Sequence, residues 1–164
     1  MKFTLEHPLP ADIDHAWTTI MSEEFFTKSY AKSGIERTLI SSEERGGKIY
    51  TTVRVKVLEP MPKVAAKVLG TTQLVWTQQQ VIDNATHIMH WNIQIPNAKQ
   101  VSAQGTFRLV ANGAQCSRIV DGDVQVKIPF VGKKAEEHVC AKLCKSYEDS
   151  ALFTQEWLTN HPKV

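Results

Sequence analysis

The sequence predicts an α+β fold, in which a curved antiparallel sheet of about seven strands wraps around one long C-terminal helix. Between residues 35 and 128, apolar and polar residues alternate with a period of two, which is typical of strands with one buried and one wet face. Residues 132–159 carry apolar residues at helical spacing instead. A sheet that is apolar on one side needs a partner, and this helix is the only large amphipathic one.

The N-terminal part reads as a short strand followed by two short helices. Residues 2–6 alternate polar and apolar residues, and the prolines at positions 8 and 10 are expected to end this strand. Asp12 and Ser22 are suitable N-caps, because their side-chain oxygens accept backbone N–H groups. Gly34 is expected to end the second helix. Apolar residues follow each cap at helical spacing: Ile13, Ala16, Trp17, Ile20 and Met21, then Phe25, Phe26 and Tyr30.

Six further strands are predicted before the C-terminal helix. Their ranges are 35–43, 48–57, 73–82, 87–96, 101–111 and 115–128. The first two are joined by the hairpin signal Glu44-Arg45-Gly46-Gly47, and residues 63–69 are expected to form a helical turn closed by Gly70. No internal repeat or linker interrupts the chain, so residues 1–164 are expected to form a single domain.

The C-terminal helix is predicted to begin at Gly132 and to run to Thr159, a length of about 40 Å. That length is enough to cross a sheet of six or seven strands diagonally. We expect an apolar row of the helix to face the concave side of the sheet: Val139, Leu143, Tyr147, Phe153 and Trp157.

Composition excludes several function classes. The formal net charge is +2, from 19 basic and 17 acidic residues, and the longest basic block is Lys133-Lys134, so we expect no nucleic-acid partner. No apolar run is long enough to span a membrane, and the N-terminus lacks the features of a signal peptide. Three cysteines, an odd count, argue against a secreted disulfide framework. We therefore expect a cytoplasmic monomer or weak dimer, for which transient membrane contact remains open.

The order of elements resembles that of the START-like helix-grip superfamily (the SRPBCC group) over nearly the whole chain. Gly122-x-Val124-x-Val126-Lys127-Ile128-Pro129-x-Val131-Gly132, then Glu136-Glu137 and Trp157-Leu158, looks more narrowly like an uncharacterised bacterial branch of that group. The resemblance implies a deep pocket between sheet and helix for lipid-like, sterol-like or polyketide-like molecules. It provides no catalytic residue to carry over.

Large apolar side chains on the predicted inner faces are candidates to line such a pocket, although any one of them taken alone is better explained as ordinary core. Small residues on the same faces, Ala103, Gly105 and Gly122, favour a pocket because they leave volume that a solid core would fill. For Gly122, a bulge that bends its strand is an equal alternative. The apolar candidates are Phe25, Phe26, Met89, Trp91, Phe107, Val139 and Leu143.

Three polar residues are further ligand-binding candidates. Tyr147 and Ser150 lie on the apolar face of the C-terminal helix, where their hydroxyls need partners from the protein or from a ligand. Arg118 alternates onto the inner face of its strand and would then hold an anionic group such as a carboxylate. The alternative is a solvated arginine at a strand end.

No metal or cofactor site is expected. Cys140 and Cys144 lie near the edge of the helix's apolar face, and His138 lies on the far side of that helix, so the three cannot share a metal. His87 and His90 point to opposite faces of their strand.

Three functions therefore compete. Binding or transfer of a hydrophobic small molecule requires a pocket and a few polar anchors. A cyclase- or aromatase-type enzyme also requires a polar group deep in the cavity, for which Tyr147, His87 and Arg118 are the candidates. A protein–protein module would use the outer sheet face, which is too polar to favour it.

Overall fold

The computed structural model describes residues 1–164 apart from the side chain of Val68. Its elements follow the predicted order of strand, two short helices, six strands and long helix. They are β1 (Lys2–Leu9), α1 (Ile13–Ile20), α2 (Glu23–Lys32), β2 (Ile35–Arg45), β3 (Lys48–Val57), α3 (Lys63–Leu69), β4 (Val75–Asp83), β5 (Ile88–Gln94), β6 (Val101–Asn112), β7 (Gln115–Val126) and α4 (Gly132–Asn160).

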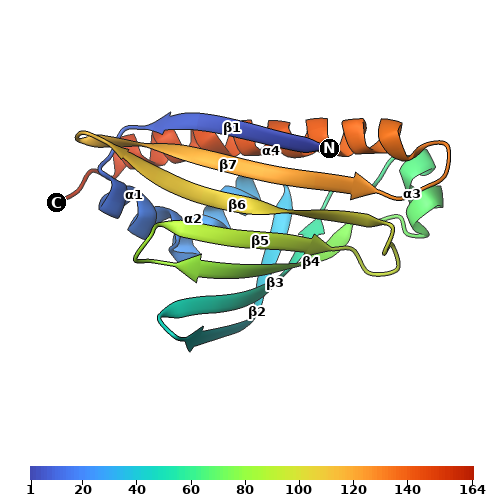
Figure 1. Ribbon diagram of the computed structural model, residues 1–164, viewed down its shortest axis with the longest axis horizontal. Helices are drawn as coiled ribbons and strands as arrows, with labels where there is room; N and C mark the ends of the chain where they lie inside the picture. Colours follow the sequence, from blue (N-terminus) through green and yellow to red (C-terminus); the bar gives the residue numbers. More distant parts are fainter.

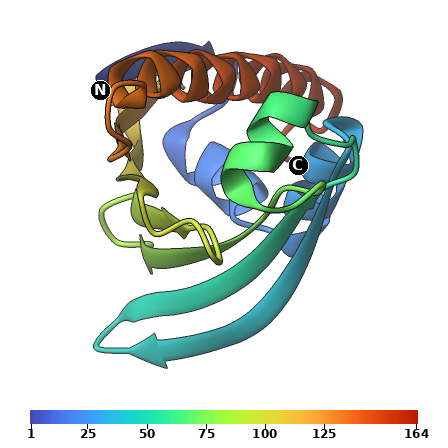
Figure 2. The ribbon, with the colours of Figure 1, turned by 90° about the vertical axis from the view of Figure 1, so that its right-hand side faces the viewer.

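The seven strands form one antiparallel sheet in the order β1-β7-β6-β5-β4-β3-β2. The sheet curls around the helices, with α4 along one side and the β2–β3 hairpin swinging away from it at the other (Figures 1 and 2). Helices α1 and α2 lie inside the curl of the sheet (Figure 2).

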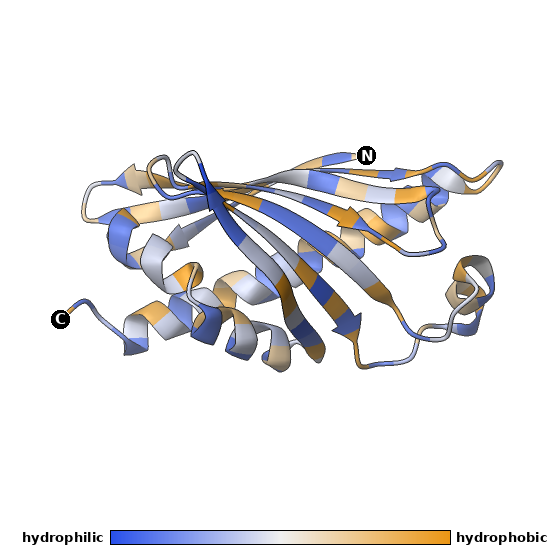
Figure 3. Ribbon diagram, turned by 90° about the horizontal axis from the view of Figure 1, so that it is seen from below, coloured by the Kyte–Doolittle hydropathy of each residue, from blue (hydrophilic) through white to orange (hydrophobic). Residues whose placement is uncertain are grey.

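Alternation along the strands separates an inner from an outer face, and Figure 3 shows apolar and polar residues following one another along the ribbons. Strand pairing continues the inner face across the sheet: Met89 pairs with Phe107, which pairs with Val120. All three side chains are buried. The prediction of one apolar and one wet face is thus confirmed for the central strands, whereas β2 is exposed on both faces from Thr38 onward.

The predicted helix caps are also confirmed. The Asp12 carboxylate accepts the His15 N–H at 3.0 Å, and the Ser22 hydroxyl accepts the Phe25 N–H at 3.2 Å. Gly34 and Gly70 both adopt positive φ, at 68° in each case. Among the described residues, no helix is long and apolar enough to cross a membrane.

The prediction that prolines end the first strand at residue 6 is wrong, because β1 extends to Leu9 and includes Pro8. β1 is an edge strand that pairs only with β7. A proline on an edge strand can turn its missing N–H toward solvent, so the ladder tolerates it.

α4 does not cross the whole sheet, as its length suggested, but lies along β1 and β7 and also meets α1 and α2 (Figure 1). Small side chains dominate its fully buried residues, which allows the helix to approach closely: Gly132, Cys140, Ala151, Thr154 and Leu158. The predicted row Val139, Leu143, Tyr147, Phe153 and Trp157 packs against the core but is only partly buried. The predicted row does face the core, but the most deeply buried residues of α4 lie beside this row on the helix surface.

The two inner-face glycines are not empty space, and this corrects the argument that they leave room for a ligand. Gly105 and Gly122 are directly paired on β6 and β7. A Cβ on Gly105 would collide with the Asp121 carbonyl oxygen and would lie 2.8 Å from the Trp91 ring. A Cβ on Gly122 would collide with the Phe3 ring. Aromatic rings thus lie over both glycines and fill the volume that the sequence suggested was vacant.

These contacts predict different costs for the two glycines. Gly105→Ala should destabilise the fold by about 3 kcal/mol, at the upper end of overpacking penalties, because a backbone carbonyl blocks the new methyl group. Gly122→Ala meets a side chain, so Phe3→Leu should relieve most of its penalty but none of the Gly105→Ala penalty. Chemical denaturation measures each free energy of unfolding. A Gly105→Ala variant as stable as the wild type would contradict this packing.

Candidate functional site

A hollow of about 480 Å³ lies between the helix pair α1–α2 and the inner face of β2, β3 and β4. The β4–β5 turn closes one side of it. Its walls combine five apolar side chains with nine polar or charged ones, so apolar surface and hydrogen-bonding groups lie side by side in it. The apolar lining residues are Trp17, Met21, Phe26, Ile49 and Ile82.

The floor of the hollow carries buried polar groups. Along β4, alternation directs Trp76, Gln78, Gln80 and Ile82 to the inner face, since their partners on β3 and β5 are inner-face residues. Gln80 is 2% exposed, and its amide oxygen accepts the Thr51 hydroxyl at 2.9 Å. Buried amides are costly without hydrogen-bond partners, so the Thr51–Gln80 pair fixes polar atoms at the floor of the hollow.

Arg37 brings a positive charge into the same hollow. Its side chain is only 3% exposed, whereas that of its partner Glu23 is 58% exposed. The guanidinium donates from Nη1 to Glu23 Oε2 at 2.7 Å and from Nη2 to Glu23 Oε1 at 3.3 Å. It also lies 4.5 Å from the centre of the Phe26 ring, and its Nε has no hydrogen-bond partner within the described part of the chain. The arrangement is a buried cation held from outside by a solvated carboxylate.

A histidine–carboxylate pair lies on another wall. His87 Nε2 is 3.1 Å from Asp14 Oδ1, and its ring packs edge-on against Trp17 with the ring centres 5.5 Å apart. The Trp17 indole N–H donates to the Asn84 side chain at 2.9 Å. His87 has φ 55°, in the turn that precedes β5. A carboxylate that orients an imidazole is an arrangement able to accept or donate a proton.

Arg118 occupies a separate buried position between β7 and α4. It is 2% exposed, so the alternative of a solvated strand-end arginine is wrong. Its guanidinium donates to the Ser150 hydroxyl at 3.2 Å, to the Tyr147 carbonyl, and to His7 Nδ1 at 3.3 Å. Burial lowers the pKa of Arg118 to about 10. The described residues provide it with no carboxylate within ion-pair distance and with no partner for Nε.

Tyr147 links this arginine to the aromatic packing over the glycines. Its ring centre lies 6.2 Å from that of Trp91 and 6.3 Å from that of Phe3. Burial raises the pKa of the Tyr147 hydroxyl well above its usual value. The hydroxyl therefore stays protonated at physiological pH and can act as a hydrogen-bond donor.

The structure divides the ten predicted ligand-binding residues between several places. Phe26 lines the hollow. Arg118, Ser150, Tyr147, Phe107 and Trp91 form one contiguous cluster under α4. Phe25 packs against Phe153 and Trp157, with ring centres 5.5 and 5.8 Å apart. Met89 is in the core, and Val139 and Leu143 are partly buried against it.

Sequence reasoning missed Arg37 and Gln80 as site residues. Both could have been found from alternation, since Arg37 shares a strand face with Ile35 and Leu39, and Gln80 shares one with Trp76 and Ile82. The described residues contain no group of three or more histidine, cysteine, aspartate or glutamate side chains placed to hold a metal ion.

A second hollow, of about 610 Å³, lies on the outer face of β4–β7 and is lined mainly by polar side chains such as Gln79, Asn92 and Gln104. Its floor is formed where Gly105 and Gly122 pair. The inner hollow has more large apolar side chains in its lining, among them Trp17, Phe26 and Ile82, so it is the better candidate for an apolar ligand.

Comparison with known protein families finds a match. Residues 4–158 match the model of the family described as "Protein of unknown function (DUF2505)". The chain matches no curated protein sequence.

Solved structures share this architecture at low sequence identity. TTHA0849 from Thermus thermophilus has a TM-score of 0.69 and 15% identity, covering 99% of this chain and 100% of that one. Norcoclaurine synthase from Thalictrum flavum, in complex with dopamine and hydroxybenzaldehyde, has a TM-score of 0.67 and 14% identity, covering 100% and 89%. A START superfamily protein from Mycobacterium smegmatis has a TM-score of 0.60 and 16% identity, covering 96% and 97%. The fold is therefore the START-like helix-grip fold, as the sequence resemblance implied.

The contact between Arg118 and His7 predicts a pH-dependent stability. Because arginine can only donate, His7 Nδ1 must accept, and burial and the nearby Arg118 charge both lower the pKa of His7 below 6.5. The unfolded chain then binds the proton more readily than the folded one, so stability is complete above about pH 6.5 and falls as the pH drops toward the folded-state value.

The variant His7→Asn keeps an acceptor oxygen near the position of Nδ1 but cannot titrate. Thermal denaturation between pH 7.5 and 5 should show a shallower loss of stability for it than for the wild type, while the other histidines contribute equally to both. Parallel pH profiles would contradict the assignment of this titration to His7.

Proposed function

The chain belongs to the family described as proteins of unknown function DUF2505, and we propose that it binds or transfers a hydrophobic small molecule that carries an acidic group. The observation that supports this best is the inner hollow, in which Met21, Phe26 and Ile82 provide apolar surface beside the buried polar groups of Gln80 and Arg37. A volume of about 480 Å³ falls within the range of small-molecule sites.

Arg37 is the reason to expect an acidic group on the ligand. A guanidinium binds carboxylate, phosphate or sulfonate oxygens through paired N–H groups, and such bonds are strongest where water is excluded. Glu23 occupies that position now, but its side chain is 58% exposed and can turn into solvent when a ligand anion replaces it. A neutral ligand would leave the ion pair in place and would gain only the apolar contacts.

The residues under α4 define an alternative position for the same ligand. The sequence suggested a cavity between the sheet and the C-terminal helix, lined by Leu143, Tyr147 and Arg118 among others. Partly buried Leu143 and Tyr147 are compatible with a ligand there, and an inward Arg118 without a carboxylate partner in the described structure would suit an anion as well. A binding assay with substitutions at both places distinguishes the two positions.

An enzyme of the cyclase or aromatase type is the second candidate. The observation that favours it is the His87–Asp14 pair on the wall of the hollow, since such a reaction needs a group that moves a proton beside the bound substrate. Norcoclaurine synthase shares the fold. Ligand binding requires no proton transfer by His87, so a proton-transfer role for the His87–Asp14 pair would identify the protein as an enzyme.

Closing the hollow should abolish binding of an apolar probe. N-phenyl-1-naphthylamine should bind the wild type with a Kd near the micromolar range, about −8 kcal/mol, and fluoresce on binding. Thr18 lines the hollow and is solvent-exposed, so Thr18→Trp should fill the hollow without disturbing the core. Thr27→Trp is the matched control, because Thr27 is exposed on α2 but does not line the hollow.

The same titration distinguishes the two positions. Thr18→Trp should lose the probe, whereas Thr27→Trp and Leu143→Ala should bind it like the wild type. If Leu143→Ala changes the affinity and Thr18→Trp does not, the ligand lies under α4. A wild-type protein that binds no apolar probe would reject the proposed function altogether.

The acidic group is tested with a matched anionic probe, 8-anilinonaphthalene-1-sulfonate, which is N-phenyl-1-naphthylamine with an added sulfonate. Arg37→Gln should weaken the anionic probe roughly ten- to hundredfold, the equivalent of one hydrogen bond to a charged group, and spare the neutral one. Glu23→Gln should strengthen the anionic probe up to about fivefold, because a competing surface carboxylate is removed. If each substitution changed the affinity of the anionic and the neutral probe to the same extent, Arg37 would not bind the charge of the ligand.

A further inference from the structure

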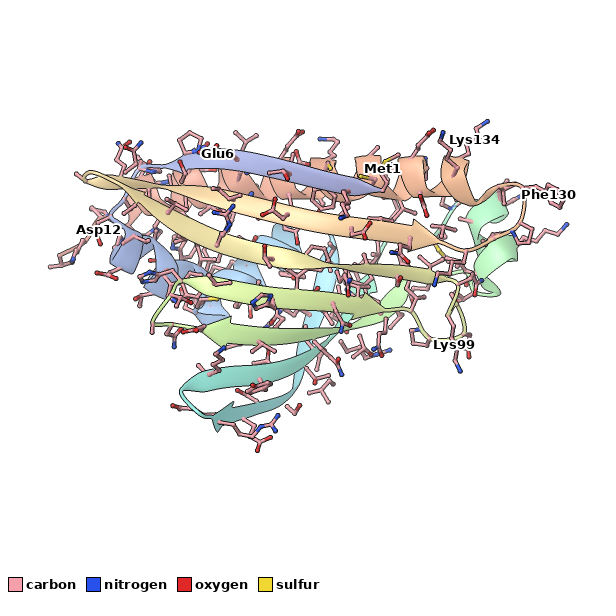
Figure 4. The ribbon with its side chains drawn as sticks, viewed as in Figure 1. Met1, Glu6, Asp12, Lys99, Phe130 and Lys134 are labelled. Atoms are coloured by element: carbon pink, nitrogen blue, oxygen red, sulfur yellow. The ribbon has the colours of Figure 1, made fainter. Side chains whose placement is uncertain are left out.

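One end of the molecule exposes several apolar side chains. Phe130, in the loop between β7 and α4, is fully exposed at 109%, and Val131 beside it is 51% exposed. Figure 4 shows Phe130 at the tip of that loop. Helix α3 lies at the same end in both Figure 1 and Figure 2, and its Val64 is 79% exposed. Scattered surface apolar residues are normal, but several gathered at one tip, including a phenylalanine, indicate an interaction surface.

The backbone holds Phe130 in an unfavourable conformation. Its φ is 67°, a left-handed value that is rare for a bulky side chain. The loop is fixed on both sides, since the Gly132 N–H donates to the Ile128 carbonyl at 2.9 Å and the Lys127 N–H donates to the Gln100 carbonyl at 2.8 Å. The backbone at Phe130 is strained, and its fully exposed ring contributes little to folding. The conformation of this residue therefore needs another explanation.

The same end is basic. Residues 58–70, 95–100 and 127–137 carry six lysines and three glutamates, a charge of +3, whereas the whole chain carries +2, which leaves −1 for the rest. Glu136 is tied back, because it accepts the Val126 N–H at 2.9 Å and lies 3.4 Å from the N-terminal ammonium group. None of the six lysines forms an ion pair with a residue that the structure describes: Lys63, Lys67, Lys99, Lys127, Lys133 and Lys134.

We propose that this basic tip (Phe130, Val131, Val64 and the six lysines) docks on an anionic lipid surface. Lysines extend their charged ends to lipid headgroups while an aromatic ring enters the boundary between headgroups and acyl chains. A protein partner fits less well, because lysine is depleted from protein–protein interfaces and this surface is rich in it. The tip lies at the opposite end of the molecule from α1, where the hollow begins, so this inference does not rest on the proposed ligand (Figure 1).

Vesicle co-sedimentation tests the proposal, with phosphatidylcholine vesicles with and without phosphatidylserine. The wild type should bind only the vesicles that contain phosphatidylserine, and added salt should release it. Phe130→Ser should weaken binding about tenfold, from the lost burial of one aromatic ring, and Phe130→Trp should preserve it. Lys133→Gln with Lys134→Gln should weaken it by about tenfold or more, from two lost contacts with the charged surface.

Matched controls come from elsewhere on α4. Leu152 is an exposed apolar residue, at 66%, and Leu152→Ser should bind like the wild type. Lys142→Gln with Lys145→Gln removes the same charge as the tip variant and should have a much smaller effect. Because all of these positions are exposed, thermal denaturation should show unchanged folding. Equal binding to both vesicle types, binding to neither, or equal losses in tip and control variants would overturn the proposal.

Discussion

The paired glycines Gly105 and Gly122 set the geometry on which the rest of the structure depends. Neither position has room for a Cβ, and the rings of Trp91 and Phe3 lie over them, from β5 and β1. Tyr147 of α4 packs against both rings and so joins the helix to this part of the sheet. Close packing of these rings on bare backbone holds α4 along β1 and β7, with Gly132, Cys140, Ala151 and Thr154 buried.

Placing α4 at one side of the sheet leaves the inner face of β2–β4 to the short helices α1 and α2. Those helices present Trp17, Met21 and Phe26 to the sheet but do not fill the space, and the hollow results. Its chemistry follows from strand alternation, which directs Gln80 and Arg37 inward among apolar neighbours. Two buried arginines, Arg37 and Arg118, then lie on the inner side of the sheet, and each has an unpaired Nε among the described residues.

The sequence was sufficient to predict the order of elements, the caps at Asp12 and Ser22 and the inner residues of β5 and β6, because these depend on local periodicity and capping chemistry. The prediction from the sequence was wrong at Gly105, because a small residue suggests unfilled volume. Only the tertiary structure shows that the Trp91 ring lies over this glycine. Arg118 was equally undetermined, because its burial depends on how closely α4 approaches β7. The hollow itself needed the tertiary arrangement, since α1, α2 and β2–β4 meet only through the curl of the sheet.

Intermolecular nuclear Overhauser effects can test whether a bound ligand lies between α1–α2 and the sheet. In protein labelled with ¹³C at methyl groups, protons of bound N-phenyl-1-naphthylamine should show contacts to the methyl groups of Met21, Ile49 and Ile82, which line the hollow. Contacts to Val139 and Leu143 alone would instead place the probe beneath α4 and would rule out binding between α1–α2 and the sheet.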